Sequence, residues 1–300
     1  MKDLTQTVTR PLQYLLTFLC GVAVFPTEFA VRIEGMGSQV GTTFVPTWIE
    51  VAYSGWHPPT DVKTATLRLP LRSIQDRIEV LMNAWDTLYK RQERAIVRLF
   101  AITLGLDLYL DTRFLFAVQA VELCHRQKWQ EGVLPKADHK RRVKSITDLV
   151  EDKTMKTWLK TKLAYSNEPT LRERLSKMVD FAGTETSEFL RSDFAKVSAD
   201  TRNYLTHYDP RGKDKASDDE DLWVLSTEVM ALLEFCLMRD LGFDGPTSFD
   251  HCAPTSTFQS LLQRQGKMSP VHISTTSAEP TDSDESTEDG DQSGGDAPSH

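Results

Sequence analysis

Apolar residues recur at steps of three and four positions over most of the chain between residues 73 and 240. This is the spacing of one face of an α-helix. The pattern therefore predicts a mainly α protein. The expected helices cover residues 73–91, 93–105, a helix capped at 111–112, and residues 142–165, 170–182, 186–208 and 221–240.

Strand-like alternation of polar and apolar residues is confined to residues 28–70. The expected strands are Phe29–Ile33, Thr47–Tyr53 and Thr66–Leu69, separated by Gly and Pro residues that interrupt strands. Two or three short strands do not make an independent sheet with a good core. The pattern thus predicts a small β-rich segment that is the edge or remnant of something larger.

The N-terminal segment Pro11–Phe25 is apolar and follows Lys2 and Arg10. A buried helix or helix-strand segment is the preferred interpretation, because the segment is short for a membrane span and polar residues interrupt it. A signal peptide and a membrane anchor are the alternatives, since a basic start followed by an apolar run is typical of export signals.

Charge is unevenly distributed along the 300 residues, which carry 35 Lys and Arg against 43 Asp and Glu, a net charge of −8. The last thirty residues hold eight carboxylates and no Lys or Arg, so the first 270 residues are balanced. The sequence from about Cys252 onward is rich in Ser, Thr, Pro, Asp and Gly, which predicts a disordered tail. A neutral body leaves nucleic-acid binding open, and an acidic tail can shield such a site.

Cysteine usage predicts neither disulfides nor a zinc site. Cys20, Cys124, Cys236 and Cys252 are scattered, without the paired spacing of metal ligands. Cys124 and Cys236 lie in apolar helical patterns, as reduced core residues of a cytoplasmic protein do. We expect no metal and no cofactor.

The segment Asp200–Pro210 carries the candidate chemistry. Four residues separate Arg202 from His207, and Asn203 follows the arginine. Asn203 and His207 are four apart and share a helix face, whereas Arg202 lies about 140° away from His207 on a regular helix. Arg202 and His207 therefore converge only if the last turn deforms before Pro210, or if a second copy faces the first.

These residue types suit RNA cleavage without a metal. A histidine can take the proton of a ribose 2′-OH or protonate the leaving 5′-oxygen. A guanidinium can grip the phosphate and stabilise charge in the transition state, while Asn203 can orient the imidazole or bind a phosphate oxygen. The structural alternative is that Arg202 and His207 complement the dipole at a helix C-terminus.

Three stretches together resemble a known family. Residues 202–208 (Arg-Asn-Tyr-Leu-Thr-His-Tyr), residues 114–125 with Glu122, and residues 73–91 with Trp85 are similar to the HEPN domain of ApeA-like proteins and the helical segment before it. The resemblance covers roughly residues 10–242. It implies a HEPN-type helical bundle, a metal-independent ribonuclease of the Arg-x4-His type, and a role in anti-phage (abortive infection) defence.

The resemblance also implies roles for further residues. Glu122 would orient Arg202 or His207; the alternative is a buried-face glutamate paired with an arginine. Tyr208 would stack on a base or simply pack. The basic run at 136–144 would attract RNA phosphates or lie in a solvated loop. Its residues are Lys136, Lys140, Arg141, Arg142 and Lys144. His125 is expected to be a surface or core histidine and not a ligand.

The expected organisation is a partial β-rich segment at 1–70, a helical linker at 71–106, the HEPN domain at 107–245 and a disordered acidic tail at 250–300. ApeA-like proteins have a longer N-terminal β domain, so either this chain is a shortened member or its start codon is assigned too late. The resemblance implies an RNA substrate, a homodimer and a phage-derived or cellular trigger, in the cytoplasm without stable membrane association. Two other functions stay open: a non-catalytic HEPN module that binds protein or nucleic acid, and a secreted or membrane-anchored helical protein.

Overall fold

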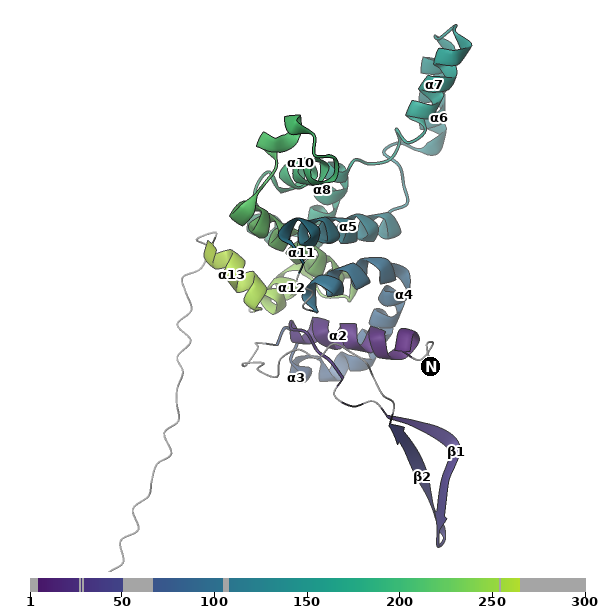
Figure 1. The fold of residues 1–300 in the computed structure, drawn as a ribbon, viewed down its shortest axis with the longest axis vertical. Coiled ribbons are helices and arrows are strands. Elements are labelled where there is room, and N and C mark those ends of the chain that lie inside the picture. The colour runs from purple at the N-terminus through teal and green to yellow at the C-terminus, as the bar shows by residue number, and fades with distance from the viewer. Residues whose placement is uncertain are drawn as a thin grey trace, which may run out of the picture. The chain divides into compact units, whose positions relative to one another are not determined.

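Helices make up most of the computed structural model, which describes residues 5–26, 28, 30–50, 67–104, 108–253 and 255–264. All of these residues belong to the compact unit Met1–Met268. The part of the predicted acidic tail beyond residue 264 lies outside the described residues. The mainly α prediction is confirmed (Figure 1). The α-helices are α2 (Arg10–Cys20), α3 (Leu71–Ile74), α4 (Ile78–Thr103), α5 (Leu110–Lys128), α6 (Lys136–Asp148), α7 (Lys153–Leu163), α8 (Leu171–Ala182), α9 (Thr184–Phe189), α10 (Phe194–His207), α11 (Asp219–Asp240), α12 (Gly245–Cys252) and α13 (Ser256–Arg264).

Helix α11 forms the centre of the bundle. Its residues from Leu225 to Met238 are buried on all sides, the environment expected for a helix that other helices surround. Helices α4, α5, α8, α12 and α13 all contact it. Helix α5 in turn contacts α4, α8 and α10, so it joins the core to α10 (Figure 1).

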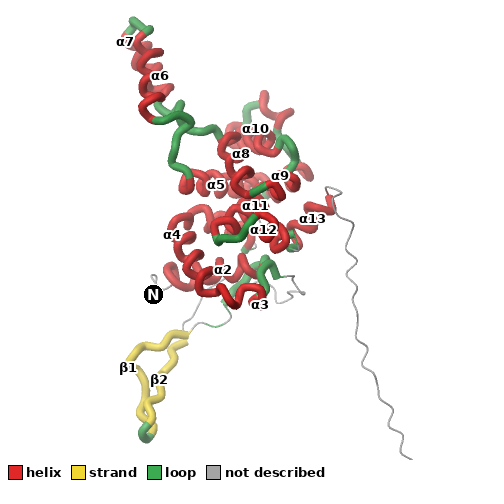
Figure 2. Tube along the Cα trace, turned by 180° about the vertical axis from the view of Figure 1, so that it is seen from behind, coloured by secondary structure: helices red, strands yellow, loops and turns green. Residues whose placement is uncertain are grey.

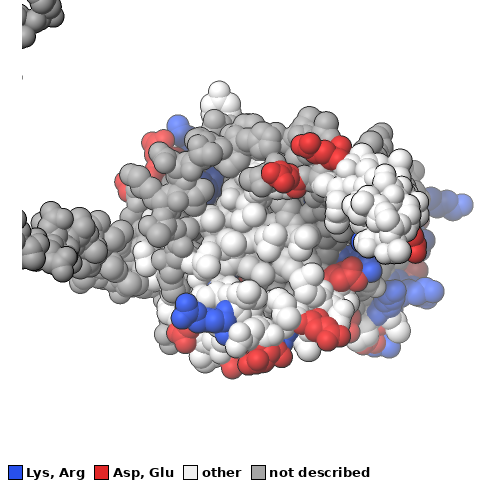
Figure 3. All heavy atoms as spheres, turned by 90° about the horizontal axis from the view of Figure 1, so that it is seen from below, with Lys and Arg blue, Asp and Glu red and all other residues white. Residues whose placement is uncertain are grey.

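The apolar N-terminal segment forms helix α2, and one face of this helix is buried. Leu15 and Phe18 are buried, and the ring of Tyr14 stacks on Phe100 of α4 at 4.8 Å. Trp85 Nε1 donates a hydrogen bond to the Pro11 carbonyl at 2.9 Å. No helix among the described residues is long and apolar enough to cross a membrane. On the face at the bottom of Figure 1, the described charged side chains of both signs lie around an uncharged centre (Figure 3).

The predicted third strand is not formed by residues 67–69, which lie in an irregular segment, while Thr66 falls outside the described residues. Arg68 is buried there, with Nη1 donating to the Phe18 carbonyl at 3.1 Å and Nη2 2.6 Å from Glu234 Oε2 of α11. A buried charge requires such a partner, so Arg68 connects the N-terminal segment to the core.

At the other two predicted positions, the strands β1 (Ala30–Val40) and β2 (Thr43–Glu50) form a hairpin. Phe29 and residues 51–53 of the predicted strands lie outside the described residues. The strands are antiparallel, with an irregularity between Arg32 and Gly37 (Figure 2). We expected β1 to end at its glycines, but Gly37 continues the strand opposite Pro46. A Cβ at position 37 would lie 2.3 Å from the Val45 carbonyl oxygen, so the close approach of β2 requires a glycine there.

Helix boundaries differ from expectation in three places. The predicted helix 186–208 is two helices, α9 and α10, because residues 190–193 between them are not helical. Residues 78–103 form one helix, α4, and the predicted separation near residue 92 appears as non-helical backbone angles at Gln92 (φ −121°, ψ 21°). Conversely, the predicted helix 142–165 is two helices, α6 and α7. Asp152 caps the second by accepting a hydrogen bond from Met155 N at 2.6 Å, which is how Asp commonly begins a helix.

The C-terminal boundary is a correction. We expected disorder from residue 250, but α12 runs to Cys252 and α13 covers Ser256–Arg264. Phe258 is fully buried, stacked on Phe189 at 5.1 Å and edge-on to Phe235 at 5.4 Å. Phe258, Leu261 and Leu262 form a short apolar face that the polar composition of the segment concealed.

Candidate active site

Helix α10 presents the Arg-Asn-x3-His motif from a firmly packed helix. Phe194, Ser198 and Thr201 form its buried face. Thr201 Oγ1 also accepts a hydrogen bond from Ser217 N at 2.9 Å, which fixes the chain that returns after the motif. Arg202, the next residue, therefore lies at the edge of the buried face, with about a third of its side chain exposed.

The end of α10 decides which way His207 points. The helix stays regular through His207, and Tyr208 then adopts left-handed angles (φ 50°, ψ 34°) while its N–H bonds the Tyr204 carbonyl at 2.6 Å. Left-handed angles are uncommon for a residue with a side chain. Because the last turn does not deform before His207, Arg202 and His207 keep their different directions within one chain.

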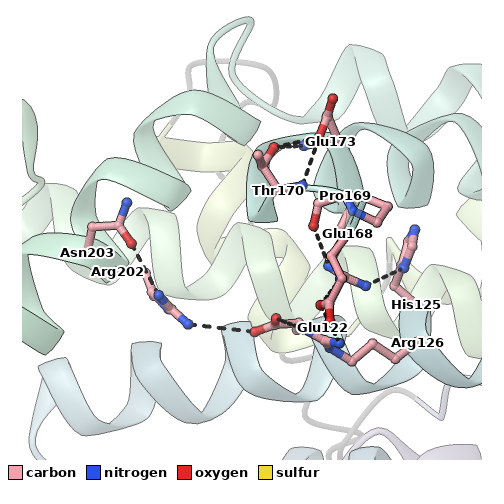
Figure 4. Close-up of polar contacts among 10 residues, drawn as sticks. Glu122, His125, Arg126, Glu168, Pro169, Thr170, Glu173, Arg202 and Asn203 are labelled. Carbon is pink, nitrogen blue, oxygen red and sulfur yellow. Dashed lines mark hydrogen bonds and ion pairs between the residues drawn. The ribbon is translucent and has the colours of Figure 1, made fainter. Parts of the chain in front are cut away.

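Arg202 points toward α5. Its Nη2 lies 3.9 Å from Glu122 Oε2, and its Nη1 donates to Asn203 Oδ1 at 3.2 Å (Figure 4). The same Glu122 accepts a hydrogen bond from Arg126 Nη2 through Oε1 at 3.2 Å. Glu122 therefore lies beside the motif arginine and also pairs with an arginine on its own helix. Both interpretations of Glu122 stay open.

The ion pairs continue from Glu122 into the bundle. Arg126 Nη1 lies 3.0 Å from Glu168 Oε2, and the same oxygen lies 3.3 Å from Arg174 Nη2 (Figure 4). Arg174 is buried, and its Nε donates to the Pro169 carbonyl at 3.0 Å. We name Arg202, Glu122, Arg126, Glu168 and Arg174 the polar chain. It alternates positive and negative groups from the motif arginine to the interior.

His125 ends the polar chain. Arg174 Nη1 lies 3.3 Å from His125 Nδ1. Since a guanidinium only donates, Nδ1 accepts and the proton of the neutral ring is on Nε2. Burial, followed by the charges of Arg174, Lys177 and Arg126, lowers the pKa of His125 to about 4. His125 is thus a buried neutral histidine, in agreement with its expected structural role.

Asn203 and His207 face an open hollow on the other side of α10. His207 is exposed and makes no hydrogen bond with the described residues. Arg211 grips Asp209 with Nε at 3.0 Å and Nη2 at 2.7 Å, and this hydrogen bonding lowers the pKa of the Asp209 carboxyl. The other residues that line the hollow are Asp200, Tyr204, Gly212 and Lys215.

The remaining candidate residues lie elsewhere. Tyr208 is 64% exposed and packs edge-on against Tyr204 at 5.8 Å, so both packing and an accessible ring are present. Lys140, Arg141 and Arg142 lie on helix α6, not in a loop. Arg141 pairs with Asp138 at 2.5 Å. The structure brings none of these three next to Arg202 or His207 through a contact among the described residues.

None of the four cysteines lines the hollow beside α10 or belongs to the polar chain. The four cysteines are free thiols, and Cys124, Cys236 and Cys252 are buried. Burial raises the pKa of Cys124 and of Cys252 to about 12, so both remain protonated. No group of three or more His, Cys, Asp or Glu side chains there is placed to hold a metal ion.

A helical bundle with an Arg-Asn-x3-His motif on one helix and an acidic partner on a neighbouring helix has the features of a HEPN domain. The family model described as Apea-like HEPN matches residues 115–246. This chain therefore contains an Apea-like HEPN domain, and the match includes Glu122, Arg202 and His207. No curated protein and no solved structure matches the chain.

Residues of the polar chain were only partly visible in the sequence. Arg126 follows Glu122 by four positions, a spacing at which opposite charges pair on a helix. Glu168 and Arg174 carry no such signal, because they reach α5 from more than 40 residues away. Asp209 and Arg211 follow the motif closely but lie on either side of Pro210, after the end of α10 and outside the helical pattern.

Proposed function

We propose that the protein is a metal-independent endoribonuclease of the HEPN type. At the level of the superfamily, a HEPN domain suggests a nuclease or an RNA-related defence effector. The observation that carries the finer proposal is the intact motif within the matched domain, with His207 exposed beside Asn203 and Arg202 beside Glu122. The exposed imidazole of His207 and the guanidinium of Arg202, whose side chain is about a third exposed, are both accessible to a phosphodiester.

The proposed reaction is attack of a ribose 2′-OH on the adjacent phosphorus. His207 accepts the 2′-OH proton as the 2′-oxygen bonds phosphorus, and the bond from phosphorus to the 5′-oxygen breaks. The protonated His207 then gives this proton to the leaving 5′-oxygen, so the products end in a 2′,3′-cyclic phosphate and a 5′-hydroxyl. Arg202 stabilises the charge on the phosphate oxygens. DNA does not react, because it lacks the 2′-OH.

The polar chain supports a positioning role for Glu122. The side chain of Arg202 has several rotatable bonds, and a carboxylate on a neighbouring helix restricts its direction. Glu122 is itself held by Arg126, and Arg126 by Glu168. Glu122 therefore acts through Arg202 and does not touch the RNA.

A homodimer would unite the two sides of the motif. HEPN domains commonly dimerise and act on RNA. Within one chain, Arg202 lies beside α5 while His207 faces the hollow. If two copies associate about a twofold axis with their α10 ends facing, the arginine of one copy and the histidine of the other share one site. This arrangement would bring an arginine and a histidine of the motif to the same phosphodiester, which one regular helix does not do.

The proposed biological role is that of an effector in anti-phage, abortive-infection defence. Such an effector cleaves RNA in the cytoplasm after a phage-derived or cellular trigger activates it. The Apea-like HEPN match supports this role.

Cleavage of a labelled RNA by the purified protein tests the proposal. We expect product ends that mass spectrometry identifies as 2′,3′-cyclic phosphate and hydroxyl, no effect of a chelator, and no cleavage of the same strand with 2′-deoxy nucleotides. Arg202→Ala and His207→Ala should each slow cleavage by about 10²-fold or more. The proposal fails if the purified dimer cuts no RNA and both variants match the wild type in a phage-infection assay.

The second candidate is a non-catalytic HEPN module that binds a protein or nucleic acid. The exposure of the motif on α10 is compatible with binding alone. Growth on overexpression distinguishes the two functions. Toxicity that disappears in His207→Ala indicates the nuclease, whereas equal toxicity of both proteins indicates a binding module.

A further inference from the structure

Helices α6 and α7 form a strongly basic pair that we name the arm (residues 136–163). It contains nine Lys and Arg residues and four Asp and Glu residues. In two opposite views, the arm stands away from the other helices (Figures 1 and 2). Thr147 is the only buried residue in α6, and α7 has none. Nearly the whole arm is therefore available to a partner.

One carboxylate shows how the lysines of the two helices are oriented. Asp148 Oδ2 lies 2.9 Å from Lys144 Nζ of α6, and its Oδ1 lies 3.2 Å from Lys156 Nζ of α7. Lys144 and Lys156 therefore lie on the same side of the arm. Each is part of a lysine row, because residues three, four or seven apart share a helix face.

The two rows define one surface, the lysine side. The two helices are antiparallel and are joined near Asp148. Lys140 lies one helical turn before Lys144, and Lys160 lies one turn after Lys156. Both are therefore about 6 Å farther from the joint along the helix axes. Among the described residues, Lys140 and Lys160 have no carboxylate partner, whereas Lys144 and Lys156 share Asp148. The lysine side consists of Lys136, Lys140, Lys144, Lys153, Lys156 and Lys160.

The opposite side has a different character. Arg142 and Lys162 lie two residues from Lys140 and Lys160, about 200° around their helices. They share that side with exposed apolar residues such as Met155 and Ile146, at 58% and 41% exposure. The arm thus has a continuous cationic side and a mixed side.

Hydrogen bonds at the base of the arm, which we name the neck, fix its direction. Asn167 accepts from Leu134 N and donates to the Leu134 carbonyl, both at 2.9 Å, and its own carbonyl accepts from Val133 N. A Cβ at Gly132 would lie 2.2 Å from Asn167 Nδ2, so the neck needs a glycine there. Glu168, the next residue, is a member of the polar chain.

We propose that the lysine side of the arm binds the phosphate backbone of an RNA strand. Ammonium groups that repeat about every 6 Å along two helices suit a polyanion with one charge per nucleotide, and such contacts do not read sequence. This inference rests on the proposed function, since it states how the substrate of that site is held. It places Lys140 of the predicted basic run on the RNA side and leaves out Arg141 and Arg142.

Binding of a fluorescein-labelled, unstructured 20-nucleotide RNA tests this inference, measured by anisotropy at several salt concentrations. All proteins carry His207→Ala, so the probe stays intact. The variant Lys140→Gln/Lys160→Gln is compared with Arg142→Gln/Lys162→Gln, which removes the same charge from the same helices on the opposite side. Circular dichroism confirms that both variants keep their helices.

We expect the lysine-side variant to lose affinity on the order of tenfold at 0.1 M salt and to flatten the salt dependence by about 0.7 per lost phosphate contact. The opposite-side variant should stay within about twofold of its parent. Equal losses of RNA affinity in both variants would mean that only the net charge of the arm matters. Unchanged RNA affinity in the lysine-side variant would leave an acidic protein as the partner. Either result overturns the inference. Cleavage dependent on His207 is scored separately, so each proposal can fail alone.

Discussion

Arg202 and His207 lie five residues apart on α10 and face different surroundings. The guanidinium lies 3.9 Å from Glu122 Oε2, whereas the imidazole faces an open hollow. This separation follows from the regular helix that continues through His207 to the left-handed Tyr208. It makes the contribution of each group, and the need for a second copy, separately testable.

Arg202→Ala should slow RNA cleavage by about 10²–10³, because one transition-state charge partner is lost. Glu122→Gln should slow it only two- to fivefold, since a partly exposed ion pair contributes about 0.2–1 kcal/mol. Single-turnover cleavage rates at saturating protein measure both. Glu79→Gln, at an exposed position of α4, is the matched control. A loss in Glu122→Gln as large as in Arg202→Ala would contradict a role limited to positioning.

Mixing two inactive variants tests whether the site is shared between copies. If Arg202 of one copy works with His207 of the other, a heterodimer of Arg202→Ala and His207→Ala retains one complete site. Random re-pairing of an equal mixture should then restore roughly a quarter of wild-type activity. The measurement is the cleavage rate after subunit exchange. A mixture no more active than its separate components would exclude the shared arrangement.

Stability should depend on the pH through His125. Its pKa is lowered to about 4 in the folded protein, so the unfolded chain, with a pKa of about 6.5, binds the proton first as the pH falls. The free energy of unfolding should therefore decrease from about pH 6.5 to about pH 4, by on the order of 3 kcal/mol from this group. Urea unfolding across this range measures it.

The variant His125→Gln isolates that contribution, because glutamine does not titrate and its oxygen can still accept from Arg174. The difference between the wild-type and variant stabilities should shrink toward low pH. Parallel stability curves for the two proteins would show that His125 does not titrate as expected.

Helix α13 should contribute to the stability of the bundle. Phe258→Ala removes a fully buried ring that packs on Phe189 and Phe235, and should cost about 3–5 kcal/mol. Gln263→Ala, on the exposed side of the same helix, should change stability by less than about 0.5 kcal/mol. Equal melting temperatures for the two variants would mean that α13 does not pack on the bundle in solution.

Local patterns in the sequence predicted where most of the helices lie. The break between the predicted helices near residue 92 coincides with the irregular Gln92, and the helix predicted at 170–182 is α8. The prediction of disorder from residue 250 was wrong for α12 and α13. The polar composition of this segment concealed the apolar face formed by Phe258, Leu261 and Leu262. Asp152 was an available signal for the start of α7 that the periodicity of 142–165 obscured.

Contacts between distant segments were not predictable from the sequence. Arg68 meets Glu234 across 166 residues, and Glu168 meets Arg126 across 42. Neither pair leaves a periodic trace in the chain, because the tertiary packing alone brings the partners together. For the same reason, the basic run at 136–144 could be recognised, but its continuation in Lys153, Lys156 and Lys160 of α7 required the fold.

The neck between Leu134 and Asn167 has an evolutionary consequence. Because two hydrogen bonds join these residues, the chain leaves and re-enters the bundle at a single point. Everything between them behaves as an insertion whose length and sequence can change while its two ends stay paired. A lineage could therefore replace the arm, and with it the bound partner, without redesigning the helices that carry Arg202 and His207.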